Sequence, residues 1–597
     1  MVTEDIKKVL RGGEFLVKET EANNIFTPED INEEQEAFRD MAREFVQKKV
    51  WPNVEKIDKG DHDLVVKLLD EAGEMGLLGS SLPEEYNGLA VNFNTESFLS
   101  EELGASHSWG VAVAAHTGIG TLPILYFGTE EQKAKYLPGL ATGELKAAYC
   151  LTEPGSGSDA LAAKTKATLV DDGANYLIEG QKMWITNSGF ADVFIVFAQV
   201  DGDKFTGFII PADAENVNLG AEEDKLGIKG SSTRQVFFEG VKVPADYVLG
   251  EIGKGHRIAF NVLNIGRYKL CAMVLGGAKR AADVAVKYAN ERQQFKTSIA
   301  NFGAIKYKIA EMATQIYAAE SSCYRTSGLI QDKIALLVEE KGITKTEAKL
   351  EAAEEYSIEC AMLKVIGSEV LDYVVDEAVQ IHGGNGFSEE YPAARAYRDA
   401  RINRIFEGTN EINRLLTVGM ILKRAMKGQV DMFGPAMEVQ KELTSFGSMG
   451  ELPEGLFGSE KAVLANMKKA ILMTAGAAAQ KYMQALEKEQ MLMTWIADML
   501  NELYNCESTL LRTEKLIAAK GEEAASHEIA MTKLYFANSV DRVNTAGKNA
   551  ICSFAEGEEL RVMLMGLKRF TKNDPVNTVA LRRTIADKLI GLNGFTY

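Results

Sequence analysis

The sequence lacks several features that would assign it quickly to a class of protein. Its six cysteines contain no CxxC pair, and its six histidines form no HxxxH or HExxH pattern. We therefore expect neither a disulfide framework nor a metal site, and the scattered cysteines suit a reducing compartment. Residues 1–20 mix acidic and basic residues without an apolar run long enough for a signal peptide or a membrane span, so we expect a cytoplasmic protein.

Positive charge is also scarce. Lys and Arg number 66 against 85 Asp and Glu, which gives a formal net charge of -19. Such a chain repels nucleic acid and anionic membranes unless a local basic patch intervenes, and we find none. We therefore expect no nucleic-acid partner. Membrane association through residues 428–458 is the less favoured alternative, because this stretch contains acids and only interrupted apolar residues.

The hydrophobic pattern changes period along the chain. It is helical up to about residue 148, and β-branched and aromatic runs with Asp-Gly turns then continue to about residue 248. Long helical patterns return after Gly255. The expected fold is mainly α with a central antiparallel β domain, and the expected units are an N-terminal extension 1–27, an N-terminal helical domain 28–148, a β domain 149–255, a helical bundle 256–427, a connector 428–458 and an appended C-terminal helical domain 459–597.

Local signals place the start and end of the first helix. Thr27 precedes Pro28, Glu29 and Asp30, which is typical of an N-cap followed by a first helical turn. Apolar residues then recur at helical spacing as far as Trp51-Pro52, where we expect the helix to stop.

A single carboxylate stands out in the stretch 404–412, RIFEGTNEI. Glu407 is flanked by apolar residues and followed by Gly408, which lets the backbone approach a ligand closely. Burial disfavours the charged form of a glutamate and raises its pKa toward working pH, as proton abstraction from carbon requires. Glu407 is therefore our candidate base, although an isolated glutamate before a glycine is more often a solvated loop residue.

Two further motifs lie in the β region, one where the helical pattern gives way to strands and one at the end of a strand pattern. Residues 149–159, YCLTEPGSGSD, combine small residues with hydroxyls and amides that bind carbonyl or phosphate oxygens. Gly155–Ala160 also fits the GxGxxA dinucleotide fingerprint, but the sequence that follows alternates like a strand instead of opening a helix, which disfavours a Rossmann unit. Residues 181–187, QKMWITN, offer an aromatic face and a hydroxyl to a flat ring, with a core tryptophan as the alternative.

Taken in order, these motifs resemble the acyl-CoA dehydrogenase family. The series is YCLTEPGSGSD, QKMWITN, ERQQF at 291–295, AVQIHGGNGF at 378–387 and RIFEGTNEI, and the resemblance covers about residues 28–427. The tail from 459 onward resembles the additional helical domain of the very-long-chain branch, which includes bacterial fatty-acid-degrading enzymes.

The resemblance implies an FAD-dependent enzyme in which Glu407 removes the α-proton of an acyl-CoA thioester while a β-hydride passes to the flavin, giving a trans-2-enoyl-CoA. The cofactor-binding residues implied within one subunit are Tyr149, Leu151, Thr152, Gly157, Ser158, Trp184, Thr186, Thr409 and Glu411. Those implied from a neighbouring subunit are Arg292, Gln294, Phe295, Gln380, Gly383 and Gly384. The implied substrate contacts are Ser158, Asn264, Arg267 and Gly408.

Two positions depart from the family pattern or bear on it. Lys296 follows ERQQF where the family commonly has glycine, which leaves the nearby cofactor turn uncertain. Position 266, where some branches carry their base, is glycine here, and this leaves Glu407 without an evident competitor. The small residues of 110–115 lie where the family's acyl cavity ends, and together with the appended domain they predict a preference for long acyl chains; a helix packed by small residues is the alternative.

The resemblance also implies partners. We expect electrons to pass to an electron-transfer flavoprotein and the chain to form a homodimer, with the appended domain in the place of the second dimer of the family's usual tetramers. An acyl-CoA oxidase that returns electrons to oxygen is the enzymatic alternative. An assembly or scaffold protein that kept the fold without the chemistry is the alternative from another class.

Overall fold

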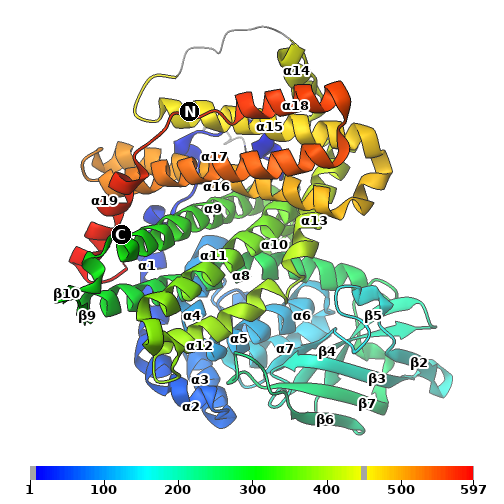
Figure 1. Cartoon of the computed structure of the whole chain (residues 1–597). Helices are drawn as coiled ribbons and strands as arrows, with labels where there is room; N and C mark the ends of the chain where they lie inside the picture. Colours follow the sequence, from blue (N-terminus) through cyan, green and yellow to red (C-terminus); the bar gives the residue numbers. More distant parts are fainter. Residues whose placement is uncertain (1–8, 445–452, 596–597) are drawn as a thin grey trace, which may run out of the picture.

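A twisted β sheet lies at one end of a molecule that is otherwise helical, and a further layer of helices covers the opposite end (Figure 1). The structure is a computed structural model that describes residues 9–444 and 453–595. The expected fold class, mainly α with a central β domain, is confirmed.

The N-terminal helices pack around a core of their own, which includes Trp109 and Phe45. These helices are α1 (Glu33–Phe45), α2 (Val54–Asp58), α3 (His62–Glu74), α4 (Phe93–Gly104), α5 (Ser108–Ala114), α6 (Leu122–Phe127) and α7 (Glu130–Thr142). Thr27 does cap a turn, but the turn is a short 3-10 helix; α1 begins later, behind a capping box formed by Asn32 and Gln35. The first helix also does not stop at Trp51, because a π-helical turn over Val46–Val50 and a 3-10 turn carry the chain on to Asn53.

The sheet has eight strands, β1 (Ala147–Cys150), β2 (Lys166–Val170), β3 (Asn175–Thr186), β4 (Val193–Val200), β5 (Lys204–Pro211), β6 (Val217–Glu222), β7 (Thr233–Pro244) and β8 (Val248–Leu249). Its order is β6-β7-β3-β2-β4-β5-β8, with β1 beside β4. Most pairs are antiparallel, as expected, but β1 and β2 each pair with β4 in the parallel sense. These two short pairings bring the chain after β1 close to β3, which matters for the site below.

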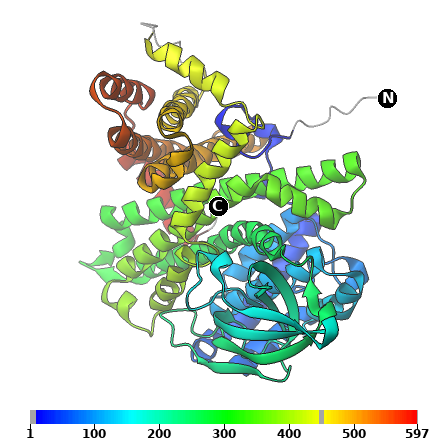
Figure 2. The same ribbon diagram turned by 90° about the vertical axis from the view of Figure 1, so that its right-hand side faces the viewer.

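Long helices form the bundle behind the sheet (Figure 2). They are α8 (Gly255–Glu291), α9 (Gly303–Lys341), α10 (Lys345–Glu355), α11 (Ser357–His382), α12 (Pro392–Ala400) and α13 (Asn410–Met426). A two-stranded hairpin of β9 (Gln293–Gln294) and β10 (Thr297–Ser298) connects α8 to α9. The α8 helix contacts both α11 and α4, so it lies between the bundle and the N-terminal helices.

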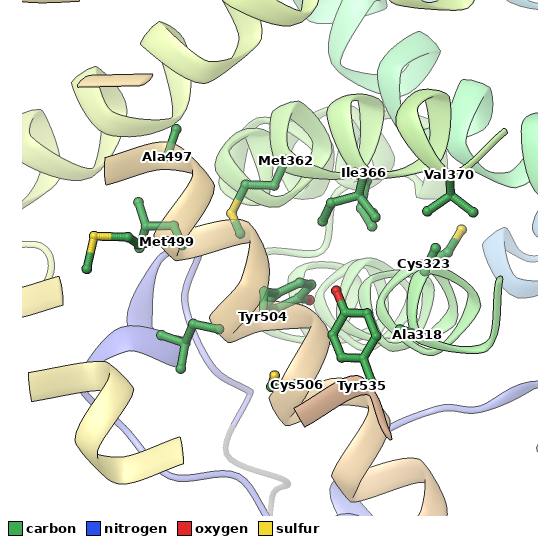
Figure 3. Packing of buried hydrophobic residues seen from close by; sticks show 14 of the residues in the cluster. Ala318, Cys323, Met362, Ile366, Val370, Ala497, Met499, Tyr504, Cys506 and Tyr535 are labelled. Carbon is green, nitrogen blue, oxygen red and sulfur yellow. The ribbon is translucent and has the colours of Figure 1, made fainter. Parts of the chain in front are cut away.

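The remaining helices cover the outer side of the bundle. They are α14 (Phe433–Thr444), α15 (Gly458–Tyr482), α16 (Gln490–Lys520), α17 (Ser526–Phe554), α18 (Gly557–Phe570) and α19 (Thr578–Leu592). The stretch expected as a connector thus contains a helix, while its glycines 447 and 450 lie outside the described residues. Figure 3 shows side chains of this joint packing, with Tyr504 and Cys506 of α16, Cys323 of α9 and Met362 of α11 in one buried cluster. One continuous apolar core therefore joins the bundle to the C-terminal helices.

The N-terminal stretch from residue 9 runs along this junction. Phe15 and Leu16 are buried in the shared core, and the ring of Phe15 lies 4.9 Å from that of Tyr504, edge to face. The amide of Gly13 donates to Glu359 Oε1 at 2.7 Å. This stretch is therefore part of the contact between bundle and C-terminal helices.

Two helical stretches, Ser108–Phe127 and Gly255–Glu291, are long and apolar enough to cross a membrane by length and composition. About two thirds of each apolar window is buried inside the protein (61% and 67%), as in core helices of the fold described above.

Candidate active site

Glu407 lies in a tight turn between α12 and α13. Its backbone is left-handed (φ 61°), as is that of Gly408 (φ 80°), and Thr409 then caps α13 by accepting a hydrogen bond from the Ile412 amide at 3.2 Å. A left-handed glutamate costs about 1–2 kcal/mol. Such a conformation persists only where its surroundings enforce it, and it turns the Glu407 side chain away from the helix that follows.

The Glu407 carboxylate lines an apolar cavity of about 140 Å³. The cavity walls come from α4, α5, the turn after α5 and α8, and include Val111, Ala115 and Met273. The Oε2 atom of Glu407 is buried without a hydrogen-bond partner. A Cβ atom at position 266 would stand only 3.0 Å from this Oε2, so the glycine there leaves room for the carboxylate.

Burial raises the pKa of Glu407, while the positive charges of Arg267 and Lys364 oppose that rise. Arg267 donates to the backbone oxygen of Glu407 at 3.4 Å and to Asn264 Oδ1 at 3.1 Å. Glu407 therefore has a carboxylate oxygen without a hydrogen-bond partner in an apolar cavity. The two nearby cations favour its ionised form without bonding to the carboxylate. This is the environment of a general base.

Trp184 lies on an irregular part of β3. The pairing of β3 with β7 shifts register between Lys182 and Ile185, and Trp184 has a left-handed backbone (φ 59°). A β-bulge re-aims the side chain that it contains, and the Trp184 ring is 53% exposed although it is the largest side chain of the strand. Thr186, two residues on, lines the Glu407 cavity.

The loop after β1 is tied to the same strand. The amide of Met183 donates to the Thr152 oxygen at 2.9 Å, and the fully buried Lys182 forms an ion pair with Glu153 at 2.7 Å. Lys182 also donates to the Leu151 oxygen at 3.2 Å. Two buried charges thus hold the YCLTEPGSGSD loop against the bulge that carries Trp184.

These residues fit a flat ring system. Trp184 is exposed, the Tyr149 hydroxyl is buried without a partner, and Cβ atoms at Gly155 and Gly157 would meet nothing within 4 Å. An aromatic face and open glycine backbone suit a flavin and its phosphate-bearing tail. Among residues 9–444 and 453–595, no group of three or more His, Cys, Asp or Glu side chains is arranged to hold a metal ion.

The predicted residues fall into two groups, and members of the first are tied to the Glu407 cavity: Thr186 and Glu407 line it, and Arg267 contacts the Glu407 backbone. The first group lies on β1 and the loop after it, on β3, on α8, and on the turn before α13 and the start of that helix: Tyr149, Leu151, Thr152, Gly157, Ser158, Trp184, Thr186, Asn264, Arg267, Glu407, Gly408, Thr409 and Glu411. The second lies at the hairpin after α8 and at the end of α11: Arg292, Gln294, Phe295, Gln380, Gly383 and Gly384.

The second group is on the opposite side of the molecule from the sheet (Figure 1). Tyr288 joins its two parts, because its ring stacks on His382 at 4.0 Å and its hydroxyl donates to the His382 oxygen at 3.2 Å. Phe295 and Phe387 are 88% and 91% exposed. None of the six residues of this group lines the Glu407 cavity.

The structure also shows what the unusual Lys296 does to the hairpin. Both Phe295 and Lys296 have left-handed backbones (φ 50° and 66°). Glycine adopts this conformation without steric cost, so the hairpin keeps its turn here with two side chains that strain it.

Sequence reasoning missed the buried polar residues that support the Glu407 turn and the loop after β1. Lys364, Asn410 and Asn413 are buried beside the Glu407 turn, and Lys182 and Glu153 pair beneath the loop after β1. Lys364 is a polar residue in an otherwise apolar run, CAMLKVIG at 360–367, which is a usable signal only once the element facing it is known.

Comparisons with known proteins agree with this site. The family descriptions that match are the acyl-CoA dehydrogenase N-terminal domain at residues 32–144, the middle domain at 148–241 and two C-terminal domains at 253–422 and 466–569. A probable acyl-CoA dehydrogenase of Bacillus subtilis is 46% identical over 98% of this chain and 99% of its own length. The human very long-chain specific acyl-CoA dehydrogenase is 35% identical over 84% of this chain and 78% of its own length.

Among solved structures, an acyl-CoA dehydrogenase from Bacillus anthracis complexed with FAD has a TM-score of 0.96 and 47% identity, covering 98% of this chain and all of that one. The fold and the site define a flavoenzyme scaffold built around a buried carboxylate. This chain belongs to the acyl-CoA dehydrogenase family, including the additional C-terminal domain, and the predicted family and class of enzyme are confirmed.

Proposed function

We propose that this protein catalyses the FAD-dependent α,β-dehydrogenation of acyl-CoA thioesters with long acyl chains and passes the electrons to an electron-transfer flavoprotein. The observation that carries the proposal is the free, buried Oε2 of Glu407 in an apolar cavity that is also lined by Thr186, two residues after the exposed Trp184. FAD fits the residues around Trp184 and is the cofactor of the similar B. anthracis structure.

In the proposed reaction, Glu407 accepts the α-proton of the thioester on its free carboxylate oxygen. Developing negative charge on the thioester oxygen needs a hydrogen-bond donor, and the Glu407 amide is the donor that we assign to it. Bound FAD would accept the hydride from the β-carbon. The apolar walls contributed by Val111 and Ala115 exclude water, which strengthens these electrostatic interactions.

The shape of the cavity supports a long acyl chain. Its lining follows one face of α8 from Val262 to Met273, a rise of about 16 Å at 1.5 Å per residue. A second cavity shares Val111, Met273 and Asn403 with it and continues along α8 to Val284. An acyl chain can therefore extend along α8 beyond the first cavity.

The second group of predicted cofactor residues supports a homodimer. Arg292 and Gln380 are exposed at positions that the Glu407 cavity of the same chain does not reach, and Arg292 offers the planar fork that binds a pyrophosphate. In a twofold assembly each chain would supply this group to the cofactor bound mainly by the other.

The decisive experiment is anaerobic titration of the purified protein with acyl-CoAs of graded length while flavin absorbance is followed. Bleaching is expected, and it tests cofactor, reaction and chain length together. In Glu407→Gln the flavin should stay bound while bleaching slows by about 10³-fold or more, because an essential base is lost. Near-normal reduction by this variant would place the base elsewhere.

Chain-length selection has its own variant. Val111→Phe narrows the junction of the two cavities, so turnover of long acyl-CoAs should fall while that of butanoyl-CoA changes little. Leu226→Phe, at an exposed position, is the matched control for the added ring. A wild-type profile that peaks at butanoyl-CoA would overturn the long-chain assignment.

Reoxidation separates the dehydrogenase from an oxidase. Substrate-reduced enzyme mixed with oxygenated buffer should reoxidise slowly, and reoxidation should become fast when an electron-transfer flavoprotein is added. Rapid oxygen consumption with release of peroxide would assign the oxidase activity instead.

A further inference from the structure

The turn that carries Glu407 is held in its left-handed conformation by side chains from three directions. From one side, Arg267 on α8 donates a hydrogen bond to the backbone oxygen of Glu407. Asn413 on α13 donates to the oxygens of Gly408 at 2.7 Å and Thr409 at 3.0 Å from another. Both contacts restrain the turn through its backbone.

The third restraint comes from α11 and acts through Asn410, the first residue of α13. Its Oδ1 accepts a hydrogen bond from Lys364 Nζ at 2.8 Å. Its Nδ2 donates to Ser368 Oγ at 3.0 Å and to Glu369 Oε1 at 3.1 Å. The start of α13, and with it the turn that precedes it, is thereby fastened to α11.

A lysine is an unusual hydrogen-bond donor to Asn410 at a buried position. Its side chain is completely buried, and within the part of the chain that the structure describes its ammonium forms no ion pair. A neutral donor such as glutamine would satisfy Asn410 without the cost of burying a charge, which amounts to several kcal/mol. The charge itself therefore needs a role.

The charged groups that act on Lys364 come from the turn before α13 and from three helices. They are Glu407 in the turn, Glu411 in the first turn of α13, Arg267 on α8 and Glu369 on α11 itself. Of these acids, Glu407 has the strongest electrostatic effect on Lys364. The Oε2 atom of its carboxylate has no hydrogen-bond partner.

We propose that Lys364 is a positioning residue that fastens the catalytic turn through Asn410 and, through its positive charge, keeps Glu407 ionised and able to accept a proton. The proposal rests on the proposed role of Glu407 as the base. It assigns a function to a residue that touches neither the substrate cavity nor the cofactor residues.

The directions of the pKa shifts of Glu407 and Lys364 agree with this proposal. Burial raises the pKa of Glu407, and Arg267 and Lys364 lower it again. Burial lowers the pKa of Lys364 to about 8, while Glu407 opposes that shift. Below that pH the lysine is charged, so its field favours the ionised form of Glu407. Without the charge, Glu407 would ionise only at higher pH.

Four variants separate the two roles. Lys364→Gln keeps a hydrogen-bond donor for Asn410 and removes the charge, and Lys364→Arg keeps the charge. Asn410→Ser weakens the anchor and leaves the charge in place. Lys308→Gln removes a lysine whose ion pair is with Glu377, elsewhere on α11, and serves as the matched control.

Two measurements on the FAD-loaded full-length protein test the proposal. One is the pH dependence of the anaerobic flavin-bleaching rate. The other is the infrared titration of the protonated Glu407 carboxyl band, assigned by its loss in Glu407→Gln. The infrared titration requires no turnover, so it measures the electrostatic effect of Lys364 on Glu407 even if Glu407 is not the base. If Glu407 is not the base, the flavin of Glu407→Gln would still be bleached by substrate.

In Lys364→Gln, the acidic limb of the rate profile and the infrared midpoint should both move up by about one pH unit, because one nearby opposite charge is lost. Lys364→Arg and Lys308→Gln should titrate like wild type, and Asn410→Ser should lower the rate without moving either midpoint. An unmoved midpoint in folded Lys364→Gln overturns the proposal. If that variant does not fold, Lys364→Met, close to lysine in volume and without a charge to bury, replaces it under the same criteria.

Discussion

Glu407 and the ion-paired carboxylates at the junction between the C-terminal helices and the bundle are buried in contrasting ways. Where the C-terminal helices meet the bundle, Arg512 binds Glu29 at 2.6 Å and Glu320 at 2.7 Å, and Arg325 pairs with Glu507 at 2.8 Å. In the active site the Glu407 carboxylate leaves one oxygen unbonded. Pairing fixes geometry at the junction, whereas an unpaired oxygen leaves a proton acceptor in the site.

The pKa shifts follow the same division. Burial tends to raise the pKa of Glu320, but the charges of Lys279 and Arg512 overcome it and bring the value down to about 2. Burial also raises the pKa of Glu407, and there the charges of Arg267 and Lys364 do not reverse the shift. Both cations beside Glu320 form ion pairs with its carboxylate, whereas neither cation near Glu407, the proposed base, is bonded to the carboxylate.

The largest expected effect comes from breaking a junction pair. Arg512→Met leaves Glu29 without its cation and removes one of the two cations from buried Glu320, and the free energy of unfolding should fall by about 3–5 kcal/mol. Chemical denaturation measures it. Arg561→Met, which breaks the exposed pair with Glu558, is the control and should change stability by less than about 0.5 kcal/mol. Equal effects of the two variants would contradict the distinction.

Glu359 tests the comparison from the junction side, because it is a junction carboxylate with an environment like that of Glu407. Burial raises its pKa to about 7, and its Oε2 has no partner. A raised acid pKa means that the folded state holds a proton that the unfolded state releases, so this group favours folding less as pH rises from about 4.5 to 7.

Glu359→Gln removes that dependence. The variant should be more stable than wild type at pH 8 by on the order of 3 kcal/mol, and the difference should shrink toward pH 5. Unfolding experiments at the two pH values measure it, and Glu354→Gln, at an exposed position on α10, reports the effect of a surface charge change. A constant difference at both pH values would show that Glu359 is already ionised in the folded protein.

The smallest effect on stability, with a clear effect on activity, is expected at Gly266. An added Cβ would meet Glu407 Oε2 at 3.0 Å and displace it by a few tenths of an ångström. Gly266→Ala should therefore slow flavin bleaching by about tenfold, while the thermal midpoint stays equal or rises, since alanine favours a helix by up to about 1 kcal/mol. Gly277→Ala on the same helix meets its nearest neighbour at an ordinary 3.5 Å and should leave the rate unchanged. A normal rate in Gly266→Ala would show that flavin bleaching does not depend on the precise position of the Glu407 carboxylate.

Much of the fold could be predicted because its long helices repeat apolar residues with a clear period. The sequence did not predict the parallel pairing of β1 and β2 with β4, since strands of four and five residues carry no signal of direction. It also did not show that Phe15 and Gly13 lie in the junction, because their partners Tyr504 and Glu359 are hundreds of residues away.

The candidate site divides in the same manner. Glu407 and Trp184 could be predicted because each belongs to a short motif, and the order of the motifs indicated the family. Lys364 could not, because it lies 43 positions before Glu407 in an apolar helix and becomes relevant only when α11 packs against the turn before α13.

The sequence by itself determined the class of enzyme, the order of its units and the identity of the carboxylate, because these depend on residue types at fixed spacings. The tertiary structure decided the conformation of Glu407, the free oxygen, the bulge that exposes Trp184 and the cations that surround the base. Burial and electrostatic interaction depend on distances through space, and only the packing of α8, α11 and α13 sets those distances.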